Sequence, residues 1–394
     1  MSKTLIVIDD DEQFSGLLAE IAKTAGYEVV VCHDAREYFD ASLTYEVMIL
    51  DLNMPSMDGI EVIRQMGELG HHSHLMLVSG YDDSVLHSAE KLAKEHQLNV
   101  LGSLSKPLKV ADFVKMLSLA ETVKVNQNQN INSDYAPISV DEILQGIRDN
   151  QMVLYFQPQV DLVTNQLEGV EALVRWQHPE RGLVPPGLFI ELAEKEGLMG
   201  ELTSHIINMA VNQSEEWKSA GFNITMSVNV SAENITSLSL PEQLSDLIDD
   251  YDLDPGSLVI EITESALMGE LTTSLDILTR LRMKGFGLSI DDFGTGNSSL
   301  VLLHRVPFTE LKIDMSFVKY MDTDVDAYAI VETCVMLAHK LHMRVVAEGI
   351  ENQNIRNSLA KMGCDIGQGY HIAKPMPAEQ MSKWMLSHKI LEFR

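Results

Sequence analysis

Two adjacent aspartates, Asp291 and Asp292, lie in the segment SIDDFGTGNSSL, directly after an apolar run and before a glycine-containing turn. At ~4 Å and an effective dielectric of ~20, two such charges repel each other by about 4 kcal/mol. An acid pair at the end of a strand therefore needs a compensating charge. Carboxylates without a His or Cys partner suit hard cations such as Mg²⁺ or Mn²⁺, so the sequence predicts a metal site here.

Further polar residues interrupt the apolar runs between 138 and 394, at or near the C-terminal ends of the predicted strands. They are Glu171, Asn229, Glu261, Glu264, Lys312, Glu348 and Gln368. That end of a barrel is where barrel enzymes place their chemistry. So many carboxylates indicate two ions ~3.5–4 Å apart, the usual arrangement for phosphodiester hydrolysis. We expect Asp291 to bridge the ions from the strand, Asp292 to bind from the loop, and Lys312 to orient the attacking water or stabilise developing charge.

Some of these residues also have a purely structural interpretation. Glu264 could cap the start of a helix, Gln368 could be a core hydrogen bonder, and Arg175 could simply pair with an acid. Glu171 and Asn229 lie inside apolar strands, where an unpaired polar group is costly, and this favours a functional role. The cluster His71, His72 and His74 precedes a strand, and we interpret it as a solvated turn.

A second polar group is predicted in the first 121 residues. Apolar runs are followed or ended by Asp9 and Asp10, Asp51 and Ser79, and Lys106 precedes a proline after a later run. In a doubly wound sheet the carboxyl ends of the strands meet, so these side chains should converge. The carboxylates would form a magnesium site, with Asp51 as nucleophile and with Ser79 and Lys106 contacting phosphoryl oxygens. The alternative for any single acid is a helix cap.

The elements that must position these residues alternate between short β-branched runs and helical patterns. Residues 1–121 predict a doubly wound parallel sheet, and the Asn/Gln-rich stretch 122–137 predicts a linker. Residues 138–394 contain eight strand candidates, the number expected of a TIM-type (β/α)8 barrel. They are 152–158, 168–176, 224–230, 257–263, 286–291, 310–314, 344–349 and 365–370. The first two have no room for a helix between them and predict a hairpin.

Composition excludes several function classes. The chain has 394 residues, with 58 Asp and Glu against 29 Lys and Arg, and a formal net charge of −29. This acidity argues against broad binding to DNA or anionic membranes. No apolar run approaches ~18 residues, so we expect no membrane span. Three well-separated cysteines fit a reducing cytoplasm.

The motifs LIVIDDD, DLNMPSMDG and SLSKP resemble those of response-regulator receiver domains, which have a flavodoxin-like fold. The resemblance implies that Asp51 is the phosphoacceptor of a two-component system and that Asp9 and Asp10 form the acid pair that binds Mg²⁺. It also implies that Ser79 is the switch hydroxyl and Lys106 the characteristic lysine. Receivers usually carry Tyr or Phe three residues before that lysine, and this chain has Ser103, which puts the usual aromatic switch in doubt.

The motifs EALVRW, SVNVS, EITES, DDFGTGNSSL, LKID, VVAEGIE and GQGYHIAKP resemble the EAL domain family of cyclic-di-GMP phosphodiesterases. The resemblance implies a modified TIM barrel with one antiparallel strand and metal-dependent opening of cyclic di-GMP to linear 5'-pGpG. The implied metal ligands are Glu171, Asn229, Glu261, Asp291, Asp292 and Glu348. The implied catalytic residues are Glu171, Lys312, Glu348, Glu264 and Gln368. Among them, Glu264 would anchor the loop that starts at Asp291. Arg175 and Gln368 would contact the substrate.

Two positions depart from the usual EAL pattern. Asn297 stands where the loop usually has Tyr, and Met315 stands where the lysine strand usually continues with Arg. Neither departure removes a predicted ligand, but Asn297 lies in the loop that links metal sites to dimer contacts in this family.

Together these features predict a cytoplasmic two-domain response regulator, with a receiver at 1–121 and a phosphodiesterase at 138–394. A sensor histidine kinase would phosphorylate Asp51, and the resemblance implies a homo-oligomer. Two alternatives stay open. The chain could be a non-catalytic cyclic-di-GMP receptor, or a regulator that works chiefly through protein contacts.

Overall fold

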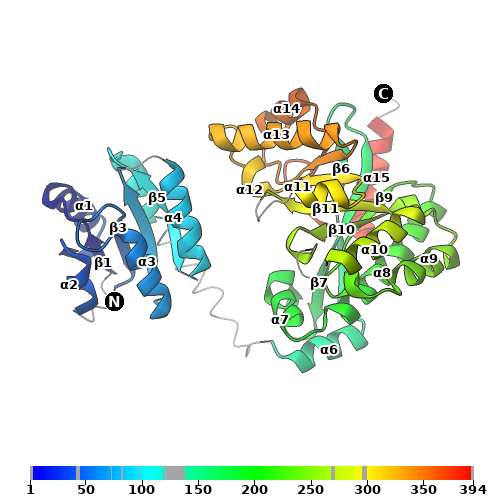
Figure 1. Ribbon diagram of the computed structural model, residues 1–394, viewed down its shortest axis with the longest axis horizontal. Helices are drawn as coiled ribbons and strands as arrows, with labels where there is room; N and C mark the ends of the chain where they lie inside the picture. Colours follow the sequence, from blue (N-terminus) through cyan, green and yellow to red (C-terminus); the bar gives the residue numbers. More distant parts are fainter. Residues whose placement is uncertain are drawn as a thin grey trace. The chain divides into compact units, whose positions relative to one another are not determined.

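The computed structural model describes residues 3–40, 45–71, 73–80, 83–96, 98–118, 120, 138–267, 271–294 and 300–391. The chain divides into two compact units, Met1–Asp134 and Tyr135–Arg394 (Figure 1). The predicted linker, 122–137, lies outside the described residues.

The first unit contains a five-stranded parallel sheet in the order β2-β1-β3-β4-β5. Its strands are β1 (Lys3–Ile8), β2 (Tyr27–Cys32), β3 (Val47–Asp51), β4 (His74–Ser79) and β5 (Asn99–Ser105). Its helices are α1 (Glu12–Thr24), α2 (Ala35–Asp40), α3 (Gly59–Glu68), α4 (Asp83–Glu95) and a helical segment at 110–118. Ile6 and Ile8 pack in one hydrophobic cluster, while Leu5 and Val7 pack in another. Alternation along β1 thus buries both faces of the sheet, and the predicted doubly wound fold is confirmed.

The second unit is a closed eight-stranded barrel, as predicted. Its wall consists of β6 (Met152–Asp161), β7 (Leu167–His178), β9 (Thr225–Asn229), β10 (Leu258–Thr263), β11 (Gly287–Phe293), β12 (Glu310–Ile313), β13 (Arg344–Ala347) and β14 (Ile366–Gly367). Strand β6 closes the barrel by pairing antiparallel with both β7 and β14. The short connection between β6 and β7 makes them the predicted hairpin. Two short strands add to this wall. β8 (Gly182–Val184) pairs antiparallel with β7, and β15 (Met376–Pro377) pairs antiparallel with β6.

Helices surround this barrel (Figure 1). They are α6 (Val140–Arg148), α7 (Ile190–Lys195), α8 (Met199–Ser219), α9 (Leu240–Asp250), α10 (Leu271–Met283), α11 (Leu300–Arg305), α12 (Met315–Val318), α13 (Val325–Lys340), α14 (Gln353–Met362) and α15 (Ala378–Leu391). Single 3₁₀ turns are η1 (Pro186–Leu188), η2 (Asn234–Thr236), η3 (Pro255–Ser257) and η4 (Ser265–Leu267). None of the helices within the described ranges is long and apolar enough to cross a membrane.

The two faces of the barrel wall differ in chemistry. Outward residues such as Ile260, Ile290 and Leu311 belong to the large hydrophobic cluster of this unit. Their neighbours Glu261 and Lys312 are also buried, and strand alternation turns them to the interior. The hydrophobic core therefore lies outside the wall, and the polar groups are held inside it.

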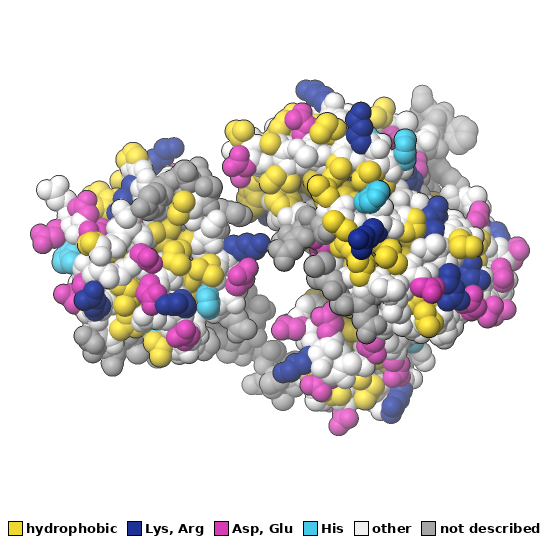
Figure 2. Space-filling view, viewed as in Figure 1, with side chains coloured by type: hydrophobic (Ala, Val, Ile, Leu, Met, Phe, Trp, Pro, Cys, Tyr) yellow, Lys and Arg dark blue, Asp and Glu magenta, His cyan; other side chains and the backbone are white. Residues whose placement is uncertain are grey.

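The visible surface offers no extended basic patch. On the face shown in Figure 2, acidic side chains are spread over both units, and the Lys and Arg side chains form no continuous stripe. Nucleic-acid phosphates bind to basic surfaces, so this face of the molecule is not suited to binding nucleic acid.

Substituting Gly169 tests the close approach of two strands inside the barrel. A Cβ at this position would lie 2.2 Å from Oγ1 and 2.9 Å from the carbonyl oxygen of Thr225. We expect Gly169→Ala to destabilise the barrel by about 1–3 kcal/mol, measured as a lower melting temperature of its unfolding transition. Gly187→Ala is the matched control, because nothing lies within 4 Å of its added methyl group. Equal melting temperatures for the two variants would contradict this packing.

Candidate functional site

Lys312 is the centre of the barrel interior. Its side chain is only 1% exposed, and it extends from β12 into a ring of carboxylates. The Nζ atom lies 2.7 Å from Glu348, 2.9 Å from Glu261, 3.2 Å from Asp291 and 3.6 Å from Glu171. These acids come from β7, β10, β11 and the residue after β13, so the barrel brings together residues that are far apart in sequence.

Glu171 is held in place by amide groups. Asn229 Nδ2 donates to Glu171 Oε1 at 2.9 Å, and Gln368 Nε2 donates to Glu171 Oε2. Gln368 Nε2 also donates to Gln157 Oε1 at 3.1 Å, while Gln159 Nε2 donates to Gln368 Oε1 at 3.0 Å. Gln368 is thus a buried hydrogen bonder, as its structural interpretation describes, and one of its bonds holds the carboxylate of Glu171. Sequence reasoning missed Gln157 and Gln159, although two glutamines at alternate positions of the run FQPQV were a usable signal.

The position of Glu171 differs from the prediction. It lies in the middle of β7 rather than near its C-terminal end. The cause is that β7 continues past the barrel interior, where Trp176, Gln177 and His178 pair with β8.

The acid pair reaches one site by a route that differs from the prediction. We expected the strand to end between Asp291 and Asp292, but β11 continues to Phe293. Instead, the pairing register with β12 shifts between Ile290 and Phe293, and Asp292 has a left-handed φ of 54°. This bulge re-aims one side chain, so both aspartates face the same way. Carboxylate oxygens of Asp291, Asp292 and Glu348 all lie within 4.8 Å of one another.

The pKa values of these groups reflect a surplus of negative charge. Burial would lower the pKa of Lys312, but Glu171, Glu261, Glu348 and Asp291 raise it well above its usual value, so the amine stays protonated. Burial raises the pKa of Glu348 to about 8 despite the opposing effect of Lys312. One ammonium is therefore insufficient to keep every acid ionised.

Asp292 and the residues around it show the same surplus. Burial, followed by repulsion from Asp291 and Asp314, raises the pKa of Asp292 to about 6. Asp314 caps α12 by accepting from the Ser316 N–H, and its carboxyl also hydrogen-bonds that of Asp292. Sequence reasoning missed Asp314, which directly follows the strand in the motif LKID.

These residues fit divalent cations. The donors are carboxylate oxygens and an amide oxygen, the ligands that Mg²⁺ and Mn²⁺ prefer. Glu261 Oε1 is buried and has no hydrogen-bond partner among the described residues. Cations bound by Asp291, Asp292 and Glu348, with Glu171, Asn229 and Glu261 beside them, would supply the missing positive charge.

The remaining predicted residues lie around this centre. Glu264 is buried between β10 and η4, and its backbone carbonyl accepts from the Leu267 N–H at 3.2 Å. Arg175 lies four residues from Glu171 on the same face of β7, ~13 Å along the strand, and its guanidinium sits 5.7 Å from the Tyr155 ring centroid. Met315 begins α12 and is 48% exposed. Asn297 lies outside the described residues.

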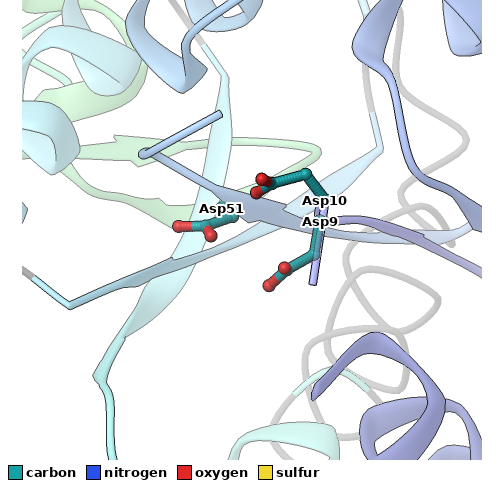
Figure 3. Close-up of side chains that lie close together, drawn as sticks. All are labelled: Asp9, Asp10 and Asp51. Carbon is teal, nitrogen blue, oxygen red and sulfur yellow. The ribbon is translucent and has the colours of Figure 1, made fainter. Parts of the chain in front are cut away.

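The first unit contains a second acid pocket. Figure 3 shows Asp9 and Asp10 after β1 beside Asp51 at the end of β3. Carboxylate oxygens of the three lie within 4.8 Å of one another. Lys106 Nζ lies 2.9 Å from Asp9 Oδ2 and 2.7 Å from Asp51 Oδ2. Burial raises the pKa of Asp9, although the hydrogen bond from Lys106 opposes this shift.

Three further residues of this unit bear on the sequence predictions. Ser79 ends β4 fully buried, and its backbone carbonyl accepts from the Lys106 N–H at 2.8 Å, next to the pocket. Asp11, by contrast, is the helix cap that the structural alternative described, since its side chain accepts from the Gln13 and Phe14 N–H groups. Ser103 lies in β5 opposite Leu77 and lines a surface cavity of about 360 Å³.

Family models match both units of the chain. Residues 140–375 match the EAL domain, and residues 5–118 match the response regulator receiver domain. The chain therefore belongs to the EAL domain family, and it carries a receiver domain that precedes the barrel in the sequence.

Named relatives match most of the chain. The cyclic di-GMP phosphodiesterase RocR of Pseudomonas aeruginosa is 31% identical over 96% of this chain and 98% of its own length. The bifunctional diguanylate cyclase/cyclic di-GMP phosphodiesterase MucR of the same organism is 33% identical over 92% of this chain, which spans 50% of that protein. Among solved structures, the cyclic-di-GMP complex of the PaMucR phosphodiesterase is 39% identical, with a TM-score of 0.59. It covers 61% of this chain and 98% of its own.

Without metal, we expect the stability of the barrel to fall as the pH rises towards about 8. The raised pKa values of Asp292 and Glu348, about 6 and about 8, mean that the folded state binds these protons more tightly than the unfolded chain does. Their stabilising effect is complete below the ordinary carboxyl pKa and is lost as the pH passes through the folded values. Calorimetric melting of the chelated protein, from about pH 5 to about pH 8, measures the effect.

The contribution of Glu348 to this pH dependence is tested with a matched pair of variants. Glu348→Gln should flatten the pH dependence, while Glu332→Gln, at an exposed position of α13, should leave it unchanged. Added Mg²⁺ should raise the melting temperature more at the alkaline end, where protons no longer compete with the cation. A chelated wild type whose melting temperature did not decline over this range would contradict the surplus of charge.

Proposed function

We propose that the barrel hydrolyses cyclic di-GMP to linear 5'-pGpG in a metal-dependent reaction, and that phosphorylation of Asp51 controls the rate. One observation carries the proposal: a buried lysine and four carboxylates contact one another inside the barrel. The names of RocR and MucR, both described as cyclic di-GMP phosphodiesterases, support the choice of substrate.

The residues of the site divide the work between them. Bound cations would supply an activated water and Lewis-acid polarisation of a phosphoryl oxygen. Glu171 stays ionised, because the charge of Lys312 and the hydrogen bonds from Gln368 and Asn229 hold its pKa below the usual value in spite of burial. Lys312 is a hydrogen-bond donor with a fixed positive charge, suited to orient water or to stabilise charge that develops on the phosphate. Arg175, further along β7, would contact a phosphate of the substrate.

The charge of the site favours catalysis over mere binding. Cyclic di-GMP is an anion, and a group of acids repels an anion unless cations lie between them. A receptor without chemistry would bind the same ligand better with basic residues in place of these acids. The acid group is instead what a metal-dependent hydrolase requires.

The receiver pocket supports control by phosphorylation. Lys106 contacts both Asp9 and Asp51, so a phosphoryl group on Asp51 would add negative charge where this ammonium is shared. The new charge would draw Lys106 and Ser79 toward it and redistribute the contacts at the ends of β1, β3 and β4. A sensor histidine kinase would supply the phosphoryl group, and we propose a homo-oligomer as the assembled form.

The catalytic proposal is tested with Glu171→Gln, which keeps the shape of the side chain and removes its charge. Because the cations contribute several kcal/mol to such reactions, we expect turnover to fall by about 10³-fold. The assay resolves cyclic di-GMP from pGpG with Mg²⁺, Mn²⁺ or chelator present. Glu168→Gln, three residues earlier on β7 and partly exposed, should retain activity. Binding of cyclic di-GMP by the wild type without turnover in either metal would overturn the proposal and favour a receptor.

The regulatory proposal is tested at Asp51. A beryllofluoride complex, which mimics a phosphoryl group on Asp, should change kcat/KM of the wild type by about fivefold or more. Asp51→Asn should be insensitive to this reagent. Asp58→Asn is the control, because Asp58 is an exposed cap of α3 and Asn caps helices equally well. An unchanged rate in the wild type, with the mimic bound, would contradict control through Asp51.

A further inference from the structure

A buried carboxylate that the mechanism does not use lies beneath Lys312. Glu310 is the first residue of β12 and is 2% exposed. It lies two residues before Lys312, so both side chains are on the interior face of the same strand, ~7 Å apart along it. In the sheet it pairs with Ser289 of β11 and Arg344 of β13.

Glu310 is fixed from one side only. Arg344 Nη2 donates to Glu310 Oε2 at 3.1 Å, and Arg344 is itself half-exposed at the opposite end of the barrel from the acid group. Glu310 Oε1 is buried and makes no hydrogen bond within the described part of the chain, although the Ser289 hydroxyl lies close by. A buried carboxylate that is only half satisfied destabilises a fold relative to an apolar residue, so packing does not explain its presence.

The charge of Glu310 acts on Lys312, which lies among the acids of the proposed active site. Burial raises its pKa, and the charge of Lys312 is among the influences that lower it, after Arg344 and the Ser289 hydroxyl. The interaction is reciprocal, so the carboxylate of Glu310 also attracts the ammonium of Lys312.

Divalent cations would change the contacts of Lys312 and would leave those of Glu310 unchanged. Glu171, Glu261, Asp291 and Glu348 all contact Lys312, and all four are also proposed ligands. When divalent cations bind these acids, they repel the ammonium that the same acids had attracted. Glu310 lies on the other side of Lys312 and is held by Arg344, outside the group of three carboxylates that lie within reach of one ion.

We propose that Glu310 is a positioning residue, whose carboxylate keeps the Lys312 ammonium in the active-site layer while divalent cations occupy the acids above it. The inference rests on the proposed metal-dependent function. Without Glu310, cations and Lys312 compete for the same acids, so both metal affinity and turnover suffer.

The test is Glu310→Gln in the full chain. The amide oxygen still accepts from Arg344, and only the charge is lost. We expect the affinity for Mn²⁺, measured by titration calorimetry without substrate, to fall about tenfold. The value of kcat should fall by about the same factor. KM for cyclic di-GMP should stay the same, as should the melting temperature of the metal-free protein. Glu310→Asp, which restores the charge, should recover most of both losses.

The control is Glu168→Gln. Glu168 Oε2 also lies 3.8 Å from Arg344, but it is partly exposed and not on the interior face with Lys312. Its loss should change neither Mn²⁺ affinity nor kcat. The proposal is overturned if Glu310→Gln binds Mn²⁺ and turns over like the wild type, or if it loses activity only in step with a lower melting temperature. Because calorimetry needs no turnover, a wild type that binds Mn²⁺ without hydrolysis would refute the proposed function while leaving Glu310 testable.

Discussion

The barrel interior depends on one interaction, the contact of the Lys312 ammonium with four carboxylates. A buried acid group of this density is unstable without positive charge, because burial and mutual repulsion both favour the protonated forms. Lys312 offsets part of that charge, and the raised pKa values of Glu348 and Asp292 show how much remains. The charge of Lys312 thus offsets part of the repulsion among the acids, and the negative charge that remains suits the site to cations.

This arrangement is possible because stability and chemistry occupy opposite faces of the same strands. Outward residues such as Ile290 and Leu311 pack beneath the helices, and that layer supplies the apolar burial on which folding depends. The inward face is then free to hold polar groups such as Ser289 and Lys312. Closure of the barrel by β6 completes this division, because the antiparallel strand brings Gln157 and Gln159 to the amide network around Glu171.

Much of this could be predicted from the sequence, since the eight strands, the hairpin and most of the acid group follow from period-two patterns and from polar residues at strand ends. Two of the failures concern backbone geometry. The bulge at Asp292 was missed because a left-handed aspartate has no local pattern that separates it from the last residue of a strand. The extension of β7 was missed because the run that carries Glu171 looks the same whether it ends at the barrel rim or passes it. The contacts of Asp314 and of the two glutamines form only when separate strands pair in the barrel, although the alternate glutamines of FQPQV were a usable signal.

The two acid pockets of the chain share one physical solution. In each, three carboxylates lie within reach of one cation, and a lysine from another strand or loop contacts two or more acids of its pocket. Lys106 is partly exposed, so its contacts could rearrange under the proposed phosphorylation of Asp51. Lys312 is sealed inside the barrel, so its contacts change only when charge enters through the C-terminal ends of the strands. The difference in burial suits a reversible switch in one pocket and a fixed catalytic centre in the other.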